Sequence, residues 1–185
     1  MAAPVSWVIA FTVCGAVACL AAVLAFLGLG QVRLAGAAAI ERDGLATGMH
    51  APTWSLRDSA GAVRTSPPLL PLQLLVFADH SLKSFPSVAE GLRELLADGS
   101  ALEIVLLLKQ PNPMAEPVLE ELGLGAVSVL QGSPALYADY NVRVGPFLIF
   151  VDSAGQVRAS SLVNYSWQVA KLRQLASLPV AAAHR

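Results

Sequence analysis

The chain has no cysteine after Cys19, although it is 185 residues long. Both of its cysteines, Cys14 and Cys19, fall in an apolar stretch near the N-terminus, so they cannot form a disulfide that holds the rest of the chain together. The redox environment of the protein therefore cannot be inferred from disulfides. Charge is also scarce, because charged residues make up 14% of the chain, against roughly 25% in an average soluble domain.

Nucleic-acid binding and metal binding lack support in the sequence. The net charge is −1, and lysine and arginine form no cluster, so no electrostatic case exists for binding to a nucleic acid. A metal site needs three or four ligands. His50, His80 and His184 are far apart and show no paired spacing. We therefore predict no metal and no other cofactor.

The scarcity of charged residues is most pronounced at the N-terminus, where residues 1–32 carry no charged side chain. As a helix, the run from Val5 to Val32 would be about 42 Å long at about 1.5 Å per residue. That exceeds the roughly 30 Å hydrocarbon core of a bilayer, so the run is long enough to span it with tilt. Trp7 fits an interfacial anchor. We predict a single transmembrane anchor over residues 1–34, with membrane lipid as its partner, followed by a linker over residues 35–49.

A cleavable signal peptide and a lipid-attached cysteine are the alternatives to this anchor. A signal peptide has a basic start and an apolar core of about 7–15 residues, and this segment has neither. Residues 37–39, all alanine, imitate a cleavage site, and Cys19 imitates a lipid-attachment site. The apolar residues that continue past Cys19 argue against lipid attachment. Arg33 and Arg42 follow the span, so the positive-inside rule weakly favours a cytoplasmic domain.

The rest of the chain alternates between segments typical of strands and segments typical of helices. Strands alternating with helices, followed by an antiparallel pair and a last helix, predict an α/β domain with a mixed central sheet flanked by helices. We place this domain at residues 50–178, before a frayed tail at 179–185. The expected strands are 53–56, 62–65, 72–77, 103–108, 127–130, 147–151 and 156–163, and the expected helices are 85–97, 115–122, 134–140 and 166–177.

One junction is the natural place for a functional site. The apolar strand 72–77 ends in the polar loop Ala78-Asp79-His80-Ser81, and an amphipathic helix begins near Phe85. In α/β sheets, ligand-holding groups lie outside the carboxyl ends of strands. The helix start adds free N–H groups and the positive end of a dipole.

Four segments, taken in order, resemble the membrane-anchored thioredoxin-like proteins of the methylamine-utilisation protein D and cytochrome-maturation types. The segments are Gly48–Leu56 (GMHAPTWSL), Leu74–Phe77 (LLVF), Tyr140–Phe147 (YNVRVGPF) and Val151–Val157 (VDSAGQV). The resemblance implies a thioredoxin-like fold preceded by one N-terminal transmembrane helix. It also implies that Pro146 follows a cis peptide bond opposite the active loop, and that the domain lies on the extracytoplasmic face.

The chain departs from that family at the redox site. The family's Cys-x-x-Cys aligns with Ser81-Leu82-Lys83-Ser84, and an alternative register places Leu82 and Phe85 there. Serine cannot replace cysteine, because disulfide exchange requires a thiolate that attacks sulfur. Thiol–disulfide oxidoreductase and thiol peroxidase activities are therefore excluded for this chain acting alone.

The expected function is a redox-inactive binding or scaffolding module, an accessory or assembly component of a membrane complex. Its contact site for a protein partner is the groove between the Asp79–Ser84 loop and Gly145-Pro146, where an extended segment would pair with the free backbone of Gly145. The alternative is a component of a thiol–disulfide pathway that acts through a partner's cysteines.

A weaker alternative is a non-redox enzyme that uses His80 and Ser81. In a catalytic triad the acid orients the imidazole and the imidazole reaches the nucleophile, and neighbours in one tight loop rarely point at each other in that way. Helix capping by Ser81 or Ser84 is the simpler interpretation, with Asp79 and His80 as solvated loop residues. No catalytic residue is predicted. Trp54 and Trp167 are predicted to lie in the core, or at most to form part of a partner surface.

Overall fold

A computed structural model describes residues 43–99 and 101–179 of the chain. The predicted anchor, the two cysteines and most of the predicted linker lie outside these ranges. Within them, no helix combines the length and apolar character needed to cross a membrane.

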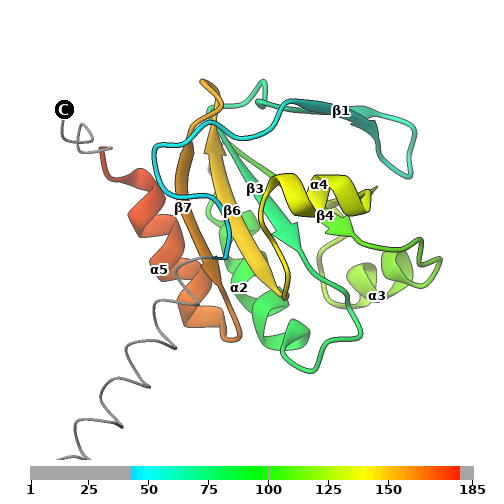
Figure 1. Ribbon diagram of the computed structural model, residues 1–185. Coiled ribbons are helices and arrows are strands. Elements are labelled where there is room, and N and C mark those ends of the chain that lie inside the picture. Colours follow the sequence, from blue (N-terminus) through cyan, green and yellow to red (C-terminus); the bar gives the residue numbers. More distant parts are fainter. Residues whose placement is uncertain (1–42, 100, 180–185) are drawn as a thin grey trace, which may run out of the picture. The chain divides into compact units, whose positions relative to one another are not determined.

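A five-stranded sheet forms the centre of the domain (Figure 1), with the strand order β5-β4-β3-β6-β7. The strands β3, β4 and β5 run parallel, whereas β6 is antiparallel to both β3 and β7. The sheet is therefore mixed, as predicted. Its strands are β3 (Leu72–Phe77), β4 (Leu102–Leu108), β5 (Ser128–Gln131), β6 (Phe147–Asp152) and β7 (Val157–Leu162).

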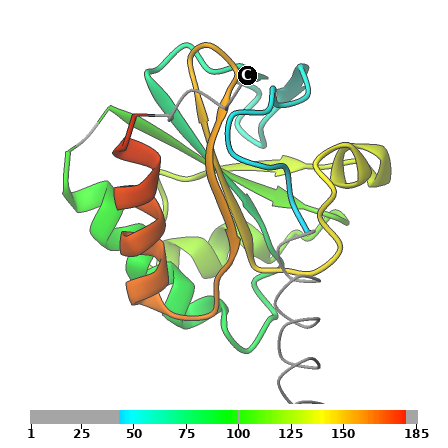
Figure 2. The same ribbon diagram turned by 60° about the vertical axis from the view of Figure 1, so that its left-hand side comes forward.

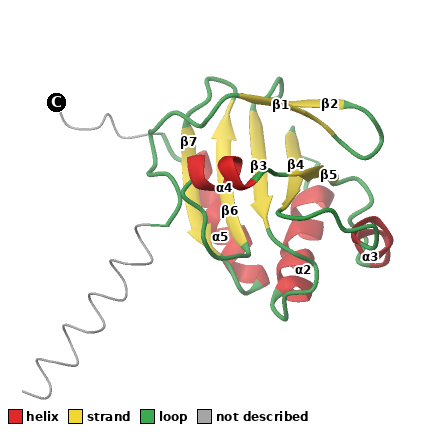
Figure 3. Ribbon diagram, turned by 45° about the vertical axis from the view of Figure 1, so that its right-hand side comes forward, coloured by secondary structure: helices red, strands yellow, loops and turns green. Residues whose placement is uncertain are grey.

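Helices cover both faces of this sheet. In Figure 2, α5 (Ser166–Ser177, red) and α2 (Phe85–Ala97, green) lie side by side against one face. Figure 3 shows α4 (Pro134–Asp139) on the opposite face, while α3 (Ala115–Glu121) lies beyond the β5 edge. A separate hairpin of β1 (Trp54–Arg57) and β2 (Val63–Ser66) precedes the sheet. The predicted α/β order of elements is confirmed, with bounds that differ by a residue or two.

The continuous apolar run of β3 is explained by burial on both faces of the sheet. Leu74 and Val76 belong to the core cluster under α2 and α5, and Leu75 and Phe77 belong to the cluster under α4. All four side chains are essentially inaccessible to solvent. The strand that precedes the candidate site is therefore fixed from both sides.

A buried polar network ties the β1–β2 hairpin to the domain. The Tyr140 hydroxyl accepts a hydrogen bond from Trp54 Nε1 (3.0 Å) and lies 3.2 Å from Ser66 Oγ. At the start of β3, the buried Gln73 donates from Nε2 to the Thr65 carbonyl and to Glu103. These bonds satisfy most of the polar groups that would otherwise be costly to bury, and Gln73 Oε1 is buried without a hydrogen-bond partner among the described residues.

Residues just before the hairpin run along β7. The amide of Gly48 donates to the Val157 carbonyl (2.8 Å), and the amide of Val157 donates to the Met49 carbonyl (2.8 Å). His50 forms an antiparallel bridge with Gln156. The beginning of the β7 edge is thus paired with the protein's own chain.

The last helix, α5, begins after an aromatic residue. Its N-cap is Tyr165, and the Gln168 side chain reaches back to accept from the amides of Tyr165 (3.1 Å) and Asn164 (2.7 Å). Trp167 is 60% exposed, so the expectation that it lies in the core is wrong, whereas its alternative, a place on a partner surface, stays a prediction. The helix turns Val169 and Leu172 toward the sheet, which leaves Trp167 on its outer side.

Candidate functional site

Asp79 and Ser81 are joined in the loop between β3 and α2. The Ser81 amide donates to Asp79 Oδ1 at 2.9 Å. This bond, the hydrogen bond from the Ser81 hydroxyl and the nearby imidazole of His80 together hold the pKa of Asp79 below its ordinary value. The amide and the hydroxyl of Ser81 therefore both bind a carboxylate of the same loop.

The expectation that His80 is a solvated loop residue is wrong, because only 13% of its side chain is exposed. Its Nδ1 lies 3.6 Å from Asp79 Oδ1 and 3.5 Å from Nδ2 of Asn112, which follows β4. Asp79 therefore contacts both His80 and Ser81. A triad would instead place the imidazole between the carboxylate and the hydroxyl. The contacts of Asp79, His80 and Ser81 therefore do not form a catalytic triad.

The helix-capping interpretation of the two serines is wrong. Ser84 occupies the N-cap position of α2, but its backbone is helical and its side chain makes no capping bond. The residues before it already form hydrogen-bonded turns, since the amide of Phe85 donates to the Leu82 carbonyl (2.9 Å). The Ser84 backbone therefore continues these turns instead of adopting the extended conformation of a typical N-cap.

Gly145 and Pro146 lie directly beside this loop. Their peptide bond is cis, as the resemblance implied, and a second cis bond that the sequence did not suggest joins Ser66 and Pro67. A Cβ atom at Gly145 would lie 2.7 Å from the Phe77 carbonyl oxygen, so the two segments approach too closely for any other residue. Phe77 in turn pairs with Phe147 across the sheet. The structure therefore brings together the two ends of the predicted site.

Exposed, unpaired backbone borders the loop on this side. Within residues 43–99 and 101–179, the backbone N–H and C=O groups of Val144 and Gly145 make no hydrogen bond. Val144 is 50% exposed, and Gly145 is exposed as well. Pro146 is buried, and its carbonyl accepts from the Val163 amide at 3.0 Å. The free backbone is thus held in place by a buried, hydrogen-bonded neighbour.

A groove of about 130 Å³ opens between the loop and this backbone. Tyr137 forms part of its lining, with its ring edge-on to Phe77 at 5.0 Å between centroids. The Tyr137 hydroxyl donates to the Leu107 carbonyl at 2.7 Å. Burial, and to a lesser degree the charge of Asp79, raise the pKa of this phenol. The other lining residues are Phe77, Ala78, Asp79, Leu82, Lys109, Arg143, Val144 and Gly145.

Two cations also belong to the groove. Lys109 Nζ lies 6.0 Å from the centre of the Tyr137 ring, within the range of a cation–π contact. Arg143 Nε lies 3.5 Å from Asp43 Oδ1. Sequence analysis did not single out Tyr137, Lys109 or Arg143. Tyr137 and Lys109 belong to no motif, and Arg143 lies in the segment Tyr140–Phe147, where only Gly145 and Pro146 were assigned a role.

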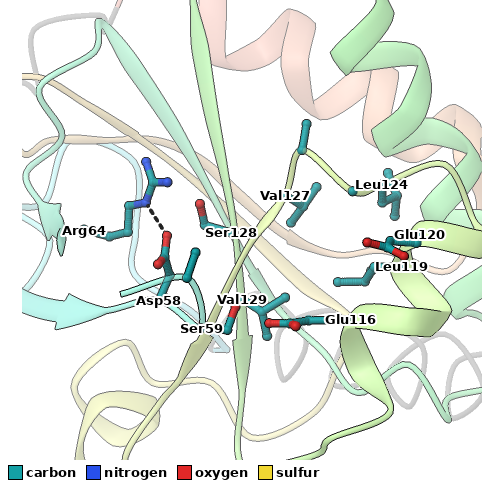
Figure 4. A pocket seen from close by; sticks show the side chains of 13 residues that line it. Asp58, Ser59, Arg64, Glu116, Leu119, Glu120, Leu124, Val127, Ser128 and Val129 are labelled. Carbon is teal, nitrogen blue, oxygen red and sulfur yellow. Dashed lines mark hydrogen bonds and ion pairs between the residues drawn. The ribbon is translucent and has the colours of Figure 1, made fainter. Parts of the chain in front are cut away.

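A larger cavity, of about 320 Å³, lies away from this groove and shares no lining residue with it. Figure 4 shows the Asp58–Arg64 ion pair on one side of the cavity and Glu116 and Glu120 on the other. Arg64 also pairs with Glu103 at 3.2 Å, which joins the hairpin to β4. The β1–β2 hairpin, α3 and the beginning of β5 line this cavity. In the described part of the chain, no cluster of three or more His, Cys, Asp or Glu residues could hold a metal ion.

Comparisons with known proteins agree on the fold. No protein-family model matches the chain, and no curated protein matches it by sequence. Solved structures do match. A peroxiredoxin-like protein from Aquifex aeolicus superimposes with a TM-score of 0.55 at 16% identity, over 71% of this chain and 88% of its own. The domain has a thioredoxin-like fold.

Two further structures with this thioredoxin-like fold are thiol–disulfide enzymes. The thioredoxin domain of a thiol-disulfide oxidoreductase from Bacteroides vulgatus matches with a TM-score of 0.56 at 18% identity, over 69% of this chain and 97% of that one. A secreted disulfide oxidoreductase of Mycobacterium tuberculosis matches with a TM-score of 0.54 at 18% identity, over 67% and 94% of the two chains. At these identities the likeness describes the fold alone.

Proposed function

We propose that this protein is a membrane-tethered, redox-inactive thioredoxin-like module that binds an extended segment of a partner protein in the groove beside Gly145. The main support is the free backbone of Val144 and Gly145 next to a loop that carries Ser81 and Ser84 in place of two thiols. The fold resembles that of thiol–disulfide oxidoreductases, but thiol–disulfide exchange requires a thiolate, and residues 20–185 contain no cysteine.

The groove offers the two features that recognition of an extended chain needs. An added segment gains affinity from main-chain hydrogen bonds and specificity from the pockets that take its side chains. Val144 and Gly145 supply free donors and acceptors, and the ring of Tyr137 with Leu82 supplies apolar lining. Asp79, Lys109 and Arg143 place charge around that lining, so a partner with matching charges would be selected.

A disulfide-reduction assay tests the redox half of this proposal. Insulin is the disulfide substrate and reduced glutathione is the reductant. Full-length protein in detergent should not raise the rate of insulin reduction above that of glutathione alone. The double variant S81C/S84C serves as the positive control for the assay, because it restores the spacing of the family's thiols. Turnover by the unmodified chain would refute the proposal.

The binding half is tested with two equally exposed valines. Val144 is 50% exposed beside the groove, and Val63 is 52% exposed on the hairpin. A partner that co-purifies from detergent-solubilised membranes should be lost with Val144→Glu and kept with Val63→Glu. Equal retention by both variants would contradict binding in the groove.

The thiol–disulfide pathway remains a second candidate, supported by the likeness to disulfide oxidoreductases. It differs from the first candidate in what the partner must carry. If a captured partner supplies the cysteines, alkylating the partner's thiols should abolish disulfide exchange by the complex. If the chain only binds, alkylation should leave the complex intact and no exchange should occur before or after it.

The tether and its orientation rest on the sequence. The uncharged run Val5–Val32 is long enough for a membrane span, and the resemblance favours the extracytoplasmic face. Protease added to sealed inverted vesicles should then leave the domain intact, whereas protease added to right-side-out spheroplasts should degrade it. The reverse pattern would place the domain in the cytoplasm.

A further inference from the structure

The outer side of α5 carries large apolar side chains that the core does not use. Trp167 is 60% exposed, Leu175 is 47% exposed and Leu178, at the end of the helix, is 56% exposed. Their spacing, together with that of Lys171, places them along one side of the helix. The outer face of a surface helix is normally polar. We call Trp167, Lys171, Leu175 and Leu178 the α5 stripe.

An exposed aromatic pair stands at the beginning of the stripe. The rings of Tyr165 and Trp167 are stacked, with centroids 6.5 Å apart and planes 9° from parallel. Tyr165 is 57% exposed. Tryptophan and tyrosine are enriched at membrane–water interfaces, because each has an apolar ring and a polar group that can stay hydrated.

The charged side chains that follow Asp152 are all basic, and one of them, Arg158, forms an ion pair with Asp152 (3.4 Å). Residues 153–185 contain no aspartate or glutamate and four lysine or arginine residues, although the whole chain has a net charge of −1. Lys171 is exposed in the middle of the stripe, and no described residue forms an ion pair with it. A hollow of about 240 Å³ opens beside it, lined in part by Ser161, Trp167 and Leu175.

We propose that the α5 stripe docks on an anionic lipid surface. The rings and leucines would enter the interfacial layer, and Lys171 would lie near lipid phosphates, the arrangement typical of helices that lie in a membrane surface. A second copy of the chain fits less well. Two stripes packed antiparallel about a two-fold axis would bring the two Lys171 ammonium groups together.

Quenching of tryptophan fluorescence tests this proposal on the full-length chain. The protein is reconstituted into vesicles of dibrominated phosphatidylcholine, with or without phosphatidylglycerol. Anionic vesicles should quench more of the emission than neutral ones, and W167F should abolish that extra quenching. Trp7 and Trp54 contribute equally to the wild type and to this variant, so the comparison isolates Trp167. High salt should also reduce the extra quenching.

A charge-reversal pair supplies the control. Lys171→Glu should bring the quenching down to the level seen with neutral vesicles, whereas Arg93→Glu, on the exposed side of α2, should leave it unchanged. Equal quenching in both kinds of vesicle, or extra quenching that survives W167F, would overturn the proposal. So would a dimer in detergent that Leu175→Gln dissociates, since the stripe would then bind a second copy. The stripe and the groove share no residue, so docking of the stripe on lipid and binding of a partner in the groove can fail independently of each other.

Discussion

Replacing Gly145 by alanine tests the close approach on which the candidate site depends. The new Cβ would lie 2.7 Å from the Phe77 carbonyl oxygen and 3.6 Å from the Ala78 Cα. A carbon normally meets a carbonyl oxygen at about 3.3–3.6 Å, so the overlap is roughly 0.6 Å or more. Both groups are backbone, so neither can rotate away. The loop and the segment before Pro146 would have to separate.

The expected cost follows from this overlap. Overpacking of this kind destabilises a protein by about 1–3 kcal/mol. For a domain of this size, a loss of about 2 kcal/mol lowers the melting temperature by roughly 5–15 °C. Thermal unfolding of the full-length protein in detergent, followed by circular dichroism, measures the change. Binding of the partner should weaken as well, because Gly145 borders the groove.

Gly125 provides the matched control. A Cβ atom there would meet only Glu120 Cγ at 3.7 Å, which is an ordinary contact. Gly125→Ala should therefore be neutral, or stabilising by up to about 1 kcal/mol through a reduced entropy of the unfolded chain. If Gly145→Ala and Gly125→Ala unfold at the same temperature, the described contact between the loop and Gly145 is not present in the protein.

Three more predictions concern named side chains. Asp79→Asn should reveal the lowered pKa of Asp79, whose ordinary value is 3.8. The carboxylate stabilises the fold above about pH 4 and loses that effect as the pH falls through the folded-state pKa, so the stability gap to the variant in urea should shrink in acid. The gap should stay below about 1 kcal/mol, because the carboxylate is half exposed, and a gap independent of pH would contradict the assignment. Tyr140→Phe should cost about 1–3 kcal/mol in urea unfolding, because Trp54 Nε1 loses its hydrogen-bond acceptor, and wild-type stability would contradict that bond. Burial raises the pKa of Tyr137 and of Tyr140 above 10.0, so their phenolate absorbance should appear late in an alkaline titration, while stability falls above pH 10. Early ionisation of both phenols would contradict their burial.

The sequence was sufficient to predict the centre of the domain. The apolar run of β3, buried on both faces, and the glycine-proline pair before β6 are local patterns with strong physical causes. The resemblance linked them, which is why the loop and Gly145 were expected side by side. The structure confirms the thioredoxin-like fold and places Asp79, His80, Ser81, Ser84, Gly145 and Pro146 at one end of the sheet. Their role in binding a partner stays a prediction.

The groove lining was not predictable in the same way. Tyr137 belongs to a short helix, Lys109 follows β4 and Arg143 precedes β6, so only the folded sheet brings them together. The capping role expected for the serines failed for a different reason, because backbone turns before α2 satisfied the helix start. Trp167 was expected in the core or on a partner surface, because the spacing of apolar residues along α5 does not say which side of the helix faces the sheet.

The pairing of residues 48–50 with the start of β7 affects how this protein behaves at high concentration. An open sheet margin is where chains join edge to edge and where fibrils grow. At the beginning of β7 the exposed edge is already paired with residues 48–50. At β5 the Ser59 amide donates to the Val129 carbonyl at 3.3 Å. Both edge strands are thus partly protected from pairing with a strand of another molecule. Aggregation through either edge would first require the covering segment to detach.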